Sequence, residues 1–353
     1  MNTPRQPDRL QWIDAAKGIG IFLVVLGHAI RPGMIAIPWC DFLFRFIYAF
    51  HMPLFFVLSG YTFAISYARY LNAPVRFIRK RAQTLLVPLI SYAAAIYLCF
   101  FIAYRIPPVR NLLSASSFAW VNPLRYLYLL FAWENPYAAH LWYIWVLFAI
   151  SLLAFALAKL LGSNRWKLIL TGLSVPCLIV AVLLPIPTAI RKMMAYLLFF
   201  AVGVLWEQYG SRLQELRRTT AALAGVGTTV ILLLSALSTA GILPDYGWIG
   251  ILKSFVIAVA VIPMIFGIIQ LCRSLSGLRI LTAAGRSSFA IYLLHQPFCC
   301  GFAGILLYDR MQLPAAVVLV LCTVLSFALP AAIVRVAHRV KWIGRIAKSL
   351  LNI

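Results

Sequence analysis

The sequence predicts an all-α polytopic membrane protein, in which a bundle of about ten transmembrane helices forms a single domain over residues 1–353. Hydrophobic residues make up 63% of the chain and charged residues only 11%, whereas a soluble domain carries about 25% charged residues. Several apolar stretches approach or exceed the roughly 20 residues that a helix needs to cross a bilayer. Together these features exclude a soluble enzyme, a disordered chain and a disulfide scaffold.

The apolar stretches define ten predicted spans, most of them separated by short connections. They lie near residues 12–31, 41–66, 84–104, 139–159, 167–185, 190–206, 219–240, 247–271, 287–307 and 315–337. The first span follows Arg5 and Arg9 but lacks a small-residue cleavage site, so we interpret it as an uncleaved membrane anchor. The longest connection, residues 105–138, is rich in proline and aromatic residues.

The net charge of +23 arises from 31 Lys and Arg residues against 8 Asp and Glu residues. The basic residues are spread over many connections rather than gathered into one patch, which argues against a nucleic-acid partner. They fall mainly in alternate connections, on the side that also holds the N-terminus. The positive-inside rule then places both termini in the cytoplasm. The basic residues are expected to interact with the anionic headgroups of the lipid bilayer.

The first span, WIDAAKGIGIFLVVLGHAI, contains three ionisable residues that are costly in a bilayer, namely Asp14, Lys17 and His28. Lys17 and His28 are eleven residues apart, close to three helical turns, so they share a face, with His28 roughly 16 Å deeper. Asp14 lies near Lys17 on that face. The alternative to a functional role is a local Asp14–Lys17 pair, with His28 bonded to a backbone carbonyl.

The second span also combines polar side chains with positions where the backbone can come close to a neighbour. His51 precedes a proline, while Ser59 and Gly60 permit close helix packing near the cytoplasmic end. Arg45 stands four residues after Asp41, so the spacing predicts an ion pair on the helix surface.

A basic cluster, Arg76, Arg79, Lys80 and Arg81, directly precedes the third span. Positive-inside topology alone explains such a cluster, and a phosphate-binding site explains it equally well, because guanidinium groups match phosphate oxygens.

Two further segments carry candidate residues on or near the outer side. Glu134 is the one acidic residue of the longest connection, and His140, Trp142 and Tyr143 follow it. Flat rings beside a carboxylate suit a carbohydrate, although an interfacial aromatic belt accounts for the rings as well. In the ninth span, AAGRSSFAIYLLHQP places Tyr292 and His295 three residues apart on one face, in a functional or a packing role.

Taken together, these residues resemble those of the acyltransferase family 3 proteins, membrane enzymes that O-acylate sugars and envelope polymers. The likeness is strongest to the fucose 4-O-acetylase-like and exopolysaccharide O-acetyltransferase subgroup, and it covers nearly the whole chain. The matching positions are Lys17 and His28; Phe56, Ser59, Gly60 and Tyr61; and Gly285, Ser288, Tyr292 and His295. One element departs: Thr84 stands where the family often has the second arginine of Arg-x-x-Arg after Arg81, and Arg76 and Arg79 have that spacing one turn earlier.

The resemblance implies an O-acetyltransferase in the cytoplasmic (inner) membrane of a bacterium. Cytoplasmic acetyl-coenzyme A is then the donor substrate, with no permanently bound cofactor and no metal. The acceptor is a sugar hydroxyl of a lipid-linked or exported polysaccharide.

Residue roles follow from that expectation. His28 acts as a base or is transiently acetylated, Asp14 orients Lys17, and Glu134 supports the acceptor side. The donor-binding candidates are Lys17, Ser59, Arg76, Arg79 and Arg81. The acceptor-binding candidates are His51, His140, Trp142, Tyr143, Tyr292 and His295.

Two other classes of protein fit part of this pattern. A transporter for an anionic substrate also places charged residues inside a bundle of broken helices, but the two halves of the chain show no paired broken segments. A non-catalytic subunit of an envelope assembly complex is the other alternative.

Overall fold

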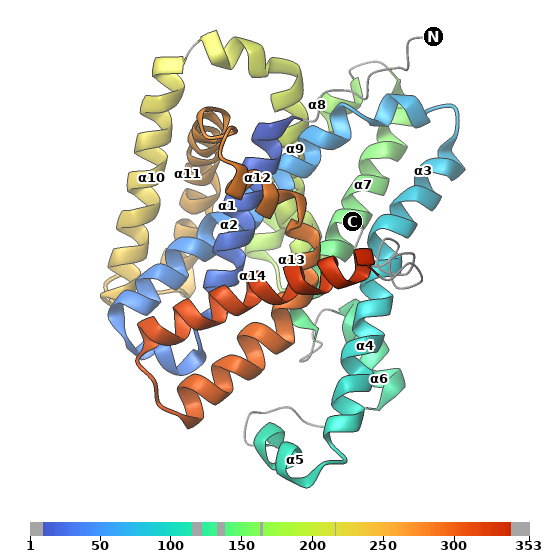
Figure 1. Cartoon of the computed structure of the whole chain (residues 1–353). Helices are drawn as coiled ribbons and strands as arrows, with labels where there is room; N and C mark the ends of the chain where they lie inside the picture. The colour runs from blue at the N-terminus through green and yellow to red at the C-terminus, as the bar shows by residue number, and fades with distance from the viewer. Residues whose placement is uncertain (1–9, 115–121, 133–137, 163–164, 216, 340–353) are drawn as a thin grey trace.

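The computed structural model describes residues 10–114, 122–132, 138–162, 165–215 and 217–339. Ten helical segments within this part of the chain are long and apolar enough to cross a membrane. The prediction of an all-α polytopic membrane protein is therefore confirmed, and the helices gather into one bundle (Figure 1).

In the first half of the chain, regular α-helices alternate with short 3-10 and π-helical segments. Their bounds are α1 Gln11–Ala29, η1 Pro32–Ala36, α2 Pro38–Ala64, η2 Tyr67–Tyr70, α3 Pro74–Arg81, η3 Ala82–Leu86, α4 Val87–Ala103, α5 Pro107–Ser114 and α6 Pro123–Ala132. The predicted third span therefore begins ten residues earlier than expected, because α3, η3 and α4 follow one another without a break from Pro74 to Ala103.

The second half contains longer helices and one broken span. The bounds are η4 Ala139–Leu141, α7 Trp142–Leu161, α8 Arg165–Leu183, α9 Thr188–Glu215, α10 Arg217–Thr239, α11 Gly247–Ser274, α12 Arg279–Arg286, α13 Ser288–Leu294, η5 His295–Phe302, η6 Ile305–Arg310 and α14 Ala315–Arg339.

We call the end of the bundle where α1 and α8 begin the upper end, and the end where α9 and α11 begin the lower end, as they appear in Figure 1.

The ninth span is not one regular helix. Gln296 has extended backbone angles (φ −119°, ψ 147°), and the residues around it form the π-helical segment η5. Pro297 explains this break, because proline lacks the N–H that a helix needs and disfavours helical angles in the residue before it. The break places His295 at the junction of α13 and η5, in the middle of the bundle.

Close backbone contacts hold the helices that carry the site. A Cβ atom at Gly285 would overlap the carbonyl oxygen of Asp14, and one at Gly60 would overlap the carbonyl oxygen of Phe200. Glycine at these positions therefore lets α12 lie directly against α1 and α2 directly against α9, which is how small residues act between membrane helices.

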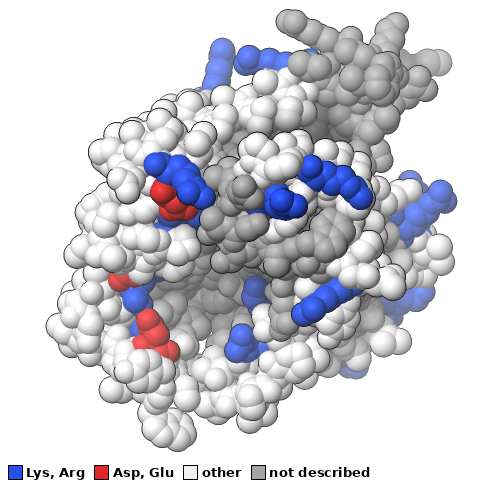
Figure 2. All heavy atoms as spheres, turned by 90° about the horizontal axis from the view of Figure 1, so that it is seen from below, with Lys and Arg blue, Asp and Glu red and all other residues white. Residues whose placement is uncertain are grey.

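A network of ion pairs joins several charged residues at the lower end. The predicted Arg45–Asp41 ion pair is present at 2.7 Å, and Arg45 also binds Asp245 at 2.7 Å. Asp245 contacts Lys253 as well, so one carboxylate joins α2 to α11. Acidic atoms visible on this end lie beside basic ones on a mostly uncharged face (Figure 2).

Candidate active site

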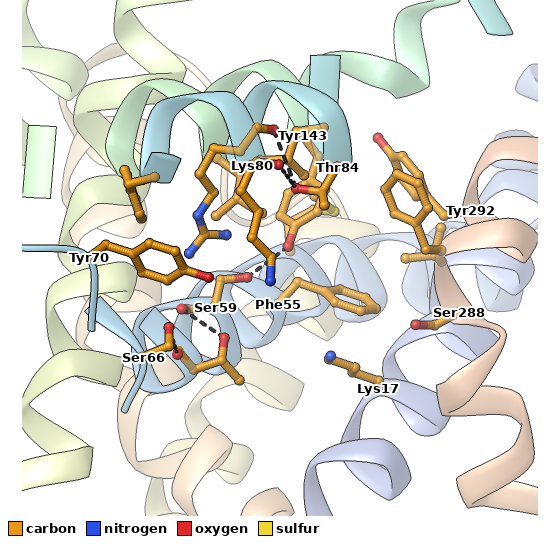
Figure 3. Close-up of a pocket in the computed structure, with 18 of the residues that line it drawn as sticks. Lys17, Phe55, Ser59, Ser66, Tyr70, Lys80, Thr84, Tyr143, Ser288 and Tyr292 are labelled. Carbon is orange, nitrogen blue, oxygen red and sulfur yellow. Dashed lines mark hydrogen bonds between the residues drawn. The ribbon is translucent and has the colours of Figure 1, made fainter. Parts of the chain in front are cut away.

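A cavity of about 410 Å³ lies among α1, α2, α3, η3, α7 and α13, toward the upper end of the bundle. Its lining contains four cations, Lys17, Arg69, Lys80 and Arg81, and no carboxylate among the residues that the structure describes. Lys17 and Lys80 extend toward the middle of the cavity from opposite walls (Figure 3). An apolar-walled cavity with an excess of cations favours an anionic ligand.

Hydroxyl groups line the space between these cations. Ser59 Oγ lies 3.0 Å from the Tyr143 hydroxyl, which joins α2 to α7 across the cavity. Thr84 also lines the cavity, but its hydroxyl donates to the carbonyl of Lys80 at 2.9 Å, one turn earlier in its own helix. Residue 84 therefore supplies no cation to the cavity, whereas Lys80, one turn earlier, does.

The structure separates the members of the basic cluster. Arg81 lines the cavity, with its guanidinium 5.4 Å from the ring centre of Phe77 and 6.0 Å from that of Phe63. Arg76 and Arg79 are exposed on α3 and do not line the cavity. Of these three arginines, only Arg81 is placed where it can contact a ligand in the cavity.

Val24 and Tyr292 line the same cavity, and their carbonyl groups hold two histidines. His28 Nδ1 lies 2.9 Å from the Val24 carbonyl oxygen, and His295 Nδ1 lies 2.7 Å from that of Tyr292. His295 Nε2 is in turn 3.4 Å from His28 Nδ1. Two residues that line the cavity therefore contact these imidazoles through their carbonyl groups, although neither imidazole lines the cavity itself.

The hydrogen bonds of three histidines show which ring nitrogen carries the proton. His51 repeats the arrangement, with Nδ1 2.7 Å from the carbonyl oxygen of Ile47. A carbonyl only accepts, so Nδ1 carries a proton in each of these rings, and in the neutral form of the ring Nε2 then has the lone pair. His28 is half-buried, whereas His51 and His295 are 2% and 0% exposed. His28 is accordingly the most accessible base of the three.

His140 and Tyr292 complete the cluster. The Tyr292 hydroxyl donates to the His140 carbonyl, and the ring centres of His140 and His295 are 5.5 Å apart. His140 Nε2 is buried and has no hydrogen-bond partner in the described part of the chain. Despite this gathering of imidazoles, the described residues form no group of three or more ligands arranged to hold a metal ion.

Other predicted residues lie apart from the histidines. Asp14 is buried beneath a separate surface cavity at the upper end, which Arg273 and Arg286 also line, so it does not share the cavity of Lys17. Trp142 lies beneath Lys192, whose Nζ is 4.3 Å from its ring centre. Glu134 lies outside the described residues.

Sequence reasoning missed several lining residues, chiefly Arg69, Tyr70 and Thr62. Arg69 had a usable signal, because it follows the second span at the same membrane side as Arg81. Tyr70 and Thr62 carried none, since an aromatic or hydroxyl residue near a span end is common.

These features define a class: a multi-pass membrane protein with a cation-lined cavity beside a cluster of imidazoles. The family model described as "Acyltransferase domain" matches residues 10–335, and the chain belongs to that acyltransferase family. The chain is thus a multi-pass membrane member of an acyltransferase family, which disfavours the transporter alternative.

Two curated relatives are both described as "Nodulation protein NolL". The protein from Sinorhizobium fredii is 29% identical over 199 residues, which cover 55% of this chain and 48% of the relative. The protein from Mesorhizobium japonicum is 36% identical over 88 residues, which cover 24% of this chain and 23% of the relative. The chain thus matches at most about half the length of these relatives. No solved structure matches it.

Proposed function

We propose that the protein transfers an acetyl group from acetyl-coenzyme A to a hydroxyl group of a sugar in an exported or lipid-linked polysaccharide. One observation carries this proposal. A single cavity holds four cations at its walls and reaches the residues whose carbonyls bind His28 and His295. A long donor with phosphates at one end and a thioester at the other fits such a cavity.

The donor's phosphates are assigned to Lys17, Arg69, Lys80 and Arg81, because cationic side chains bind phosphate through charge-assisted hydrogen bonds. Its arm then lies along Ser59 and Tyr143. The thioester carbonyl comes to rest beside Val24, within reach of His28.

The reaction requires a base, and His28 is assigned this role. Its Nε2 takes the proton of the sugar hydroxyl as that oxygen attacks the thioester carbonyl. The carbon–sulfur bond of the resulting tetrahedral intermediate breaks, and the leaving sulfur takes the proton from His28. The products are the acetyl ester and the free thiol of coenzyme A, and His28 returns to its neutral form. The Nδ1 bond to Val24 keeps the ring in the tautomer that the reaction needs.

A two-step route uses the same atom. His28 Nε2 attacks the thioester carbonyl, the carbon–sulfur bond breaks, and coenzyme A leaves as its thiolate, so that the ring carries the acetyl group. The sugar oxygen then attacks this acetyl group, the carbon–nitrogen bond breaks, and the proton of the hydroxyl passes to the thiolate, which leaves the acetyl ester, the free thiol and neutral His28. Rapid acid quenching with labelled donor and no acceptor separates the routes, because only the two-step route leaves label on the protein.

We place the upper end of the bundle and both termini in the cytoplasm, in a bacterial inner membrane. The alternation of basic residues supports this orientation, and so does the location of the cation-lined cavity at that end. The acceptor approaches from the lower end, on the outer side.

Purified protein incubated with radiolabelled acetyl-coenzyme A tests the proposal. We expect label to reach a polysaccharide or lipid-linked sugar acceptor, and to fail to do so with the His28→Gln protein, whose amide is not a base. If the wild-type protein moves label neither to an acceptor nor onto itself, the proposal is wrong.

A further inference from the structure

A second cavity, of about 400 Å³, opens at the lower end of the bundle. It is formed by the last turn of α8 and the first two turns of α9 and α11. Its charged lining residues are Arg191, Lys192 and Asp245. None of the residues assigned above to the donor or to the histidine cluster takes part in it.

The electrostatics of this cavity favour an anion. Asp245 is already bound by Arg45 and Lys253, so its negative charge is compensated. Within the described part of the chain, neither Arg191 nor Lys192 lies within ion-pair distance of a carboxylate. The cavity therefore presents two cations whose charges no carboxylate offsets.

Two helix N-termini reinforce these charges. α9 begins at Thr188 and α11 at Gly247, and the early residues of both helices line the cavity. No side chain caps the start of α11. The first backbone N–H groups of a helix lack intrahelical partners, and the helix dipole makes this end positive, so both helices favour a bound anion.

Aromatic rings stand beside the cations. The Trp142 and Tyr196 ring centres are 5.1 Å apart, and Lys192 Nζ lies over Trp142. Phe56 packs against Tyr196 at 4.7 Å and against Tyr143 at 5.0 Å. Tyr143 lines the donor cavity and Tyr196 lines the lower one, so a few aromatic rings link the two cavities.

We infer that the lower cavity binds an oxyanion of the acceptor, a carboxylate or phosphate attached to the sugar, with Arg191 and Lys192 as its ligands and the Tyr196 ring against the sugar ring. The inference rests on the proposed function, because it takes the acceptor to be a sugar that approaches from the lower end. It adds that the acceptor is acidic rather than neutral.

Equilibrium binding to the purified full-length protein tests this inference. The probes are methyl β-glucuronide for a sugar carboxylate, glucose 1-phosphate for the phosphate of a carrier-linked sugar, and methyl β-glucoside as the neutral match. We expect at least one anionic probe to bind about tenfold or more tightly than the neutral one, since each charge-assisted hydrogen bond is worth a tenfold factor or more. The preferred probe identifies the source of the oxyanion. Equal binding of all three probes would overturn the inference.

Variants locate the site. Lys192→Gln and Arg191→Gln should each reduce binding of the preferred anion about tenfold, while Lys192→Arg should retain most of it. Arg310→Gln removes an exposed cation at the same end that does not line the cavity, and should leave binding unchanged. Tight anion binding in both glutamine variants, or equal loss in the Arg310→Gln protein, would contradict the assignment. Binding of acetyl-coenzyme A to the wild-type protein, measured alongside, tests the donor half of the proposed function separately.

Discussion

Among single residues, three histidines share one hydrogen-bond pattern but differ in how accessible they are. His28, His51 and His295 each place Nδ1 against a backbone carbonyl of the preceding helical turn. The alternative considered from the sequence, a histidine bonded to its backbone, is therefore present at His28 as well. It does not compete with a catalytic role, because the bond fixes Nδ1 and leaves Nε2 available as a base. Accessibility, rather than the bond itself, distinguishes His28 from the other two.

The His28→Ala protein should lose acetyl transfer while it keeps its place in the membrane, because the substitution removes one half-buried ring and leaves the glycine contacts between the helix backbones in place. A positioned base contributes roughly 10²- to 10⁴-fold to a rate. Transfer by the detergent-purified variant should thus fall below about one hundredth of the wild-type rate. Retention of more than about a tenth of the activity would remove His28 from the base role.

Arg81→Gln should raise the apparent KM for acetyl-coenzyme A about tenfold, with the acceptor KM little changed, because loss of a charge-assisted hydrogen bond costs about that factor. Arg79→Gln is the matched control, two residues away on the same helix but exposed and outside the cavity. Initial rates at varied donor concentration measure both variants. An equal effect of the two substitutions would mean that the cluster acts through its overall charge and not through the cavity.

For the helices as elements, glycine decides which pairs come into direct contact. Two glycines that the sequence associated with the family pattern, Gly60 and Gly285, lie where a neighbouring backbone leaves no room for a side chain. Their role is to set the distance between helices, and through it the position of the histidines and Lys17.

Gly285→Ala should destabilise the protein by about 1–3 kcal/mol, the usual cost of forcing an extra carbon into a packed contact. Here the obstacle is the Asp14 carbonyl, which is backbone and cannot rotate away. Gly172→Ala, in the exposed part of α8, meets no atom within 4 Å and serves as the control. Thermal unfolding in detergent should show a lower Tm for the first variant and an unchanged or higher Tm for the second. The same Tm for both would argue against the close packing of α1 and α12.

The ion pairs that join α2 to α11 should make the stability of the folded protein depend on pH. Hydrogen bonds from Arg45 and Lys253 hold the pKa of the Asp245 carboxyl below its ordinary value of 3.8. A depressed pKa stabilises the folded state fully above the pKa of the unfolded chain, and this contribution is lost as the pH falls through the folded value. The Tm difference between the wild-type and Asp245→Asn proteins should be constant from pH 7 to 5 and should shrink below about pH 4. The effect is small because the Asp245 side chain is 58% exposed. A difference that persists down to pH 2 would rule out this role for the carboxylate.

For the whole molecule, the two cavities lie toward opposite ends of the bundle, and a chain of aromatic rings connects their walls. If the donor enters at the upper end and the acceptor at the lower end, the enzyme moves an acetyl group across the membrane as it transfers it.

Single cysteines test this orientation in a protein from which the seven free cysteines have been removed. Position 80 lies at the upper end and position 128 in α6, and both native side chains are exposed. An impermeant thiol reagent should label position 80 only from the cytoplasmic side and position 128 only from outside. Labelling of position 80 from outside would mean that the chain has the opposite orientation in the membrane. Sealed vesicles then test the transfer, because acetyl-coenzyme A and an impermeant acceptor should react when supplied on opposite sides.

The sequence by itself determined the membrane class, the ten spans and the Arg45–Asp41 pair. It could do so because these properties depend on apolar length and on spacing within one helix, which are local. The same holds for the shared face of Lys17 and His28, which follows from helical periodicity.

Only the tertiary structure decided which residues meet. It placed His295, from the broken ninth span, 3.4 Å from His28 of the first, and it placed Arg81 but not Arg79 in the wall of the cavity. It also revealed Lys192 over Trp142. Such contacts depend on how helices far apart in the sequence pack and rotate against one another. In a membrane, where every span is apolar on most of its surface, periodicity alone does not specify that rotation, and close contacts at residues such as Gly60 and Gly285 do.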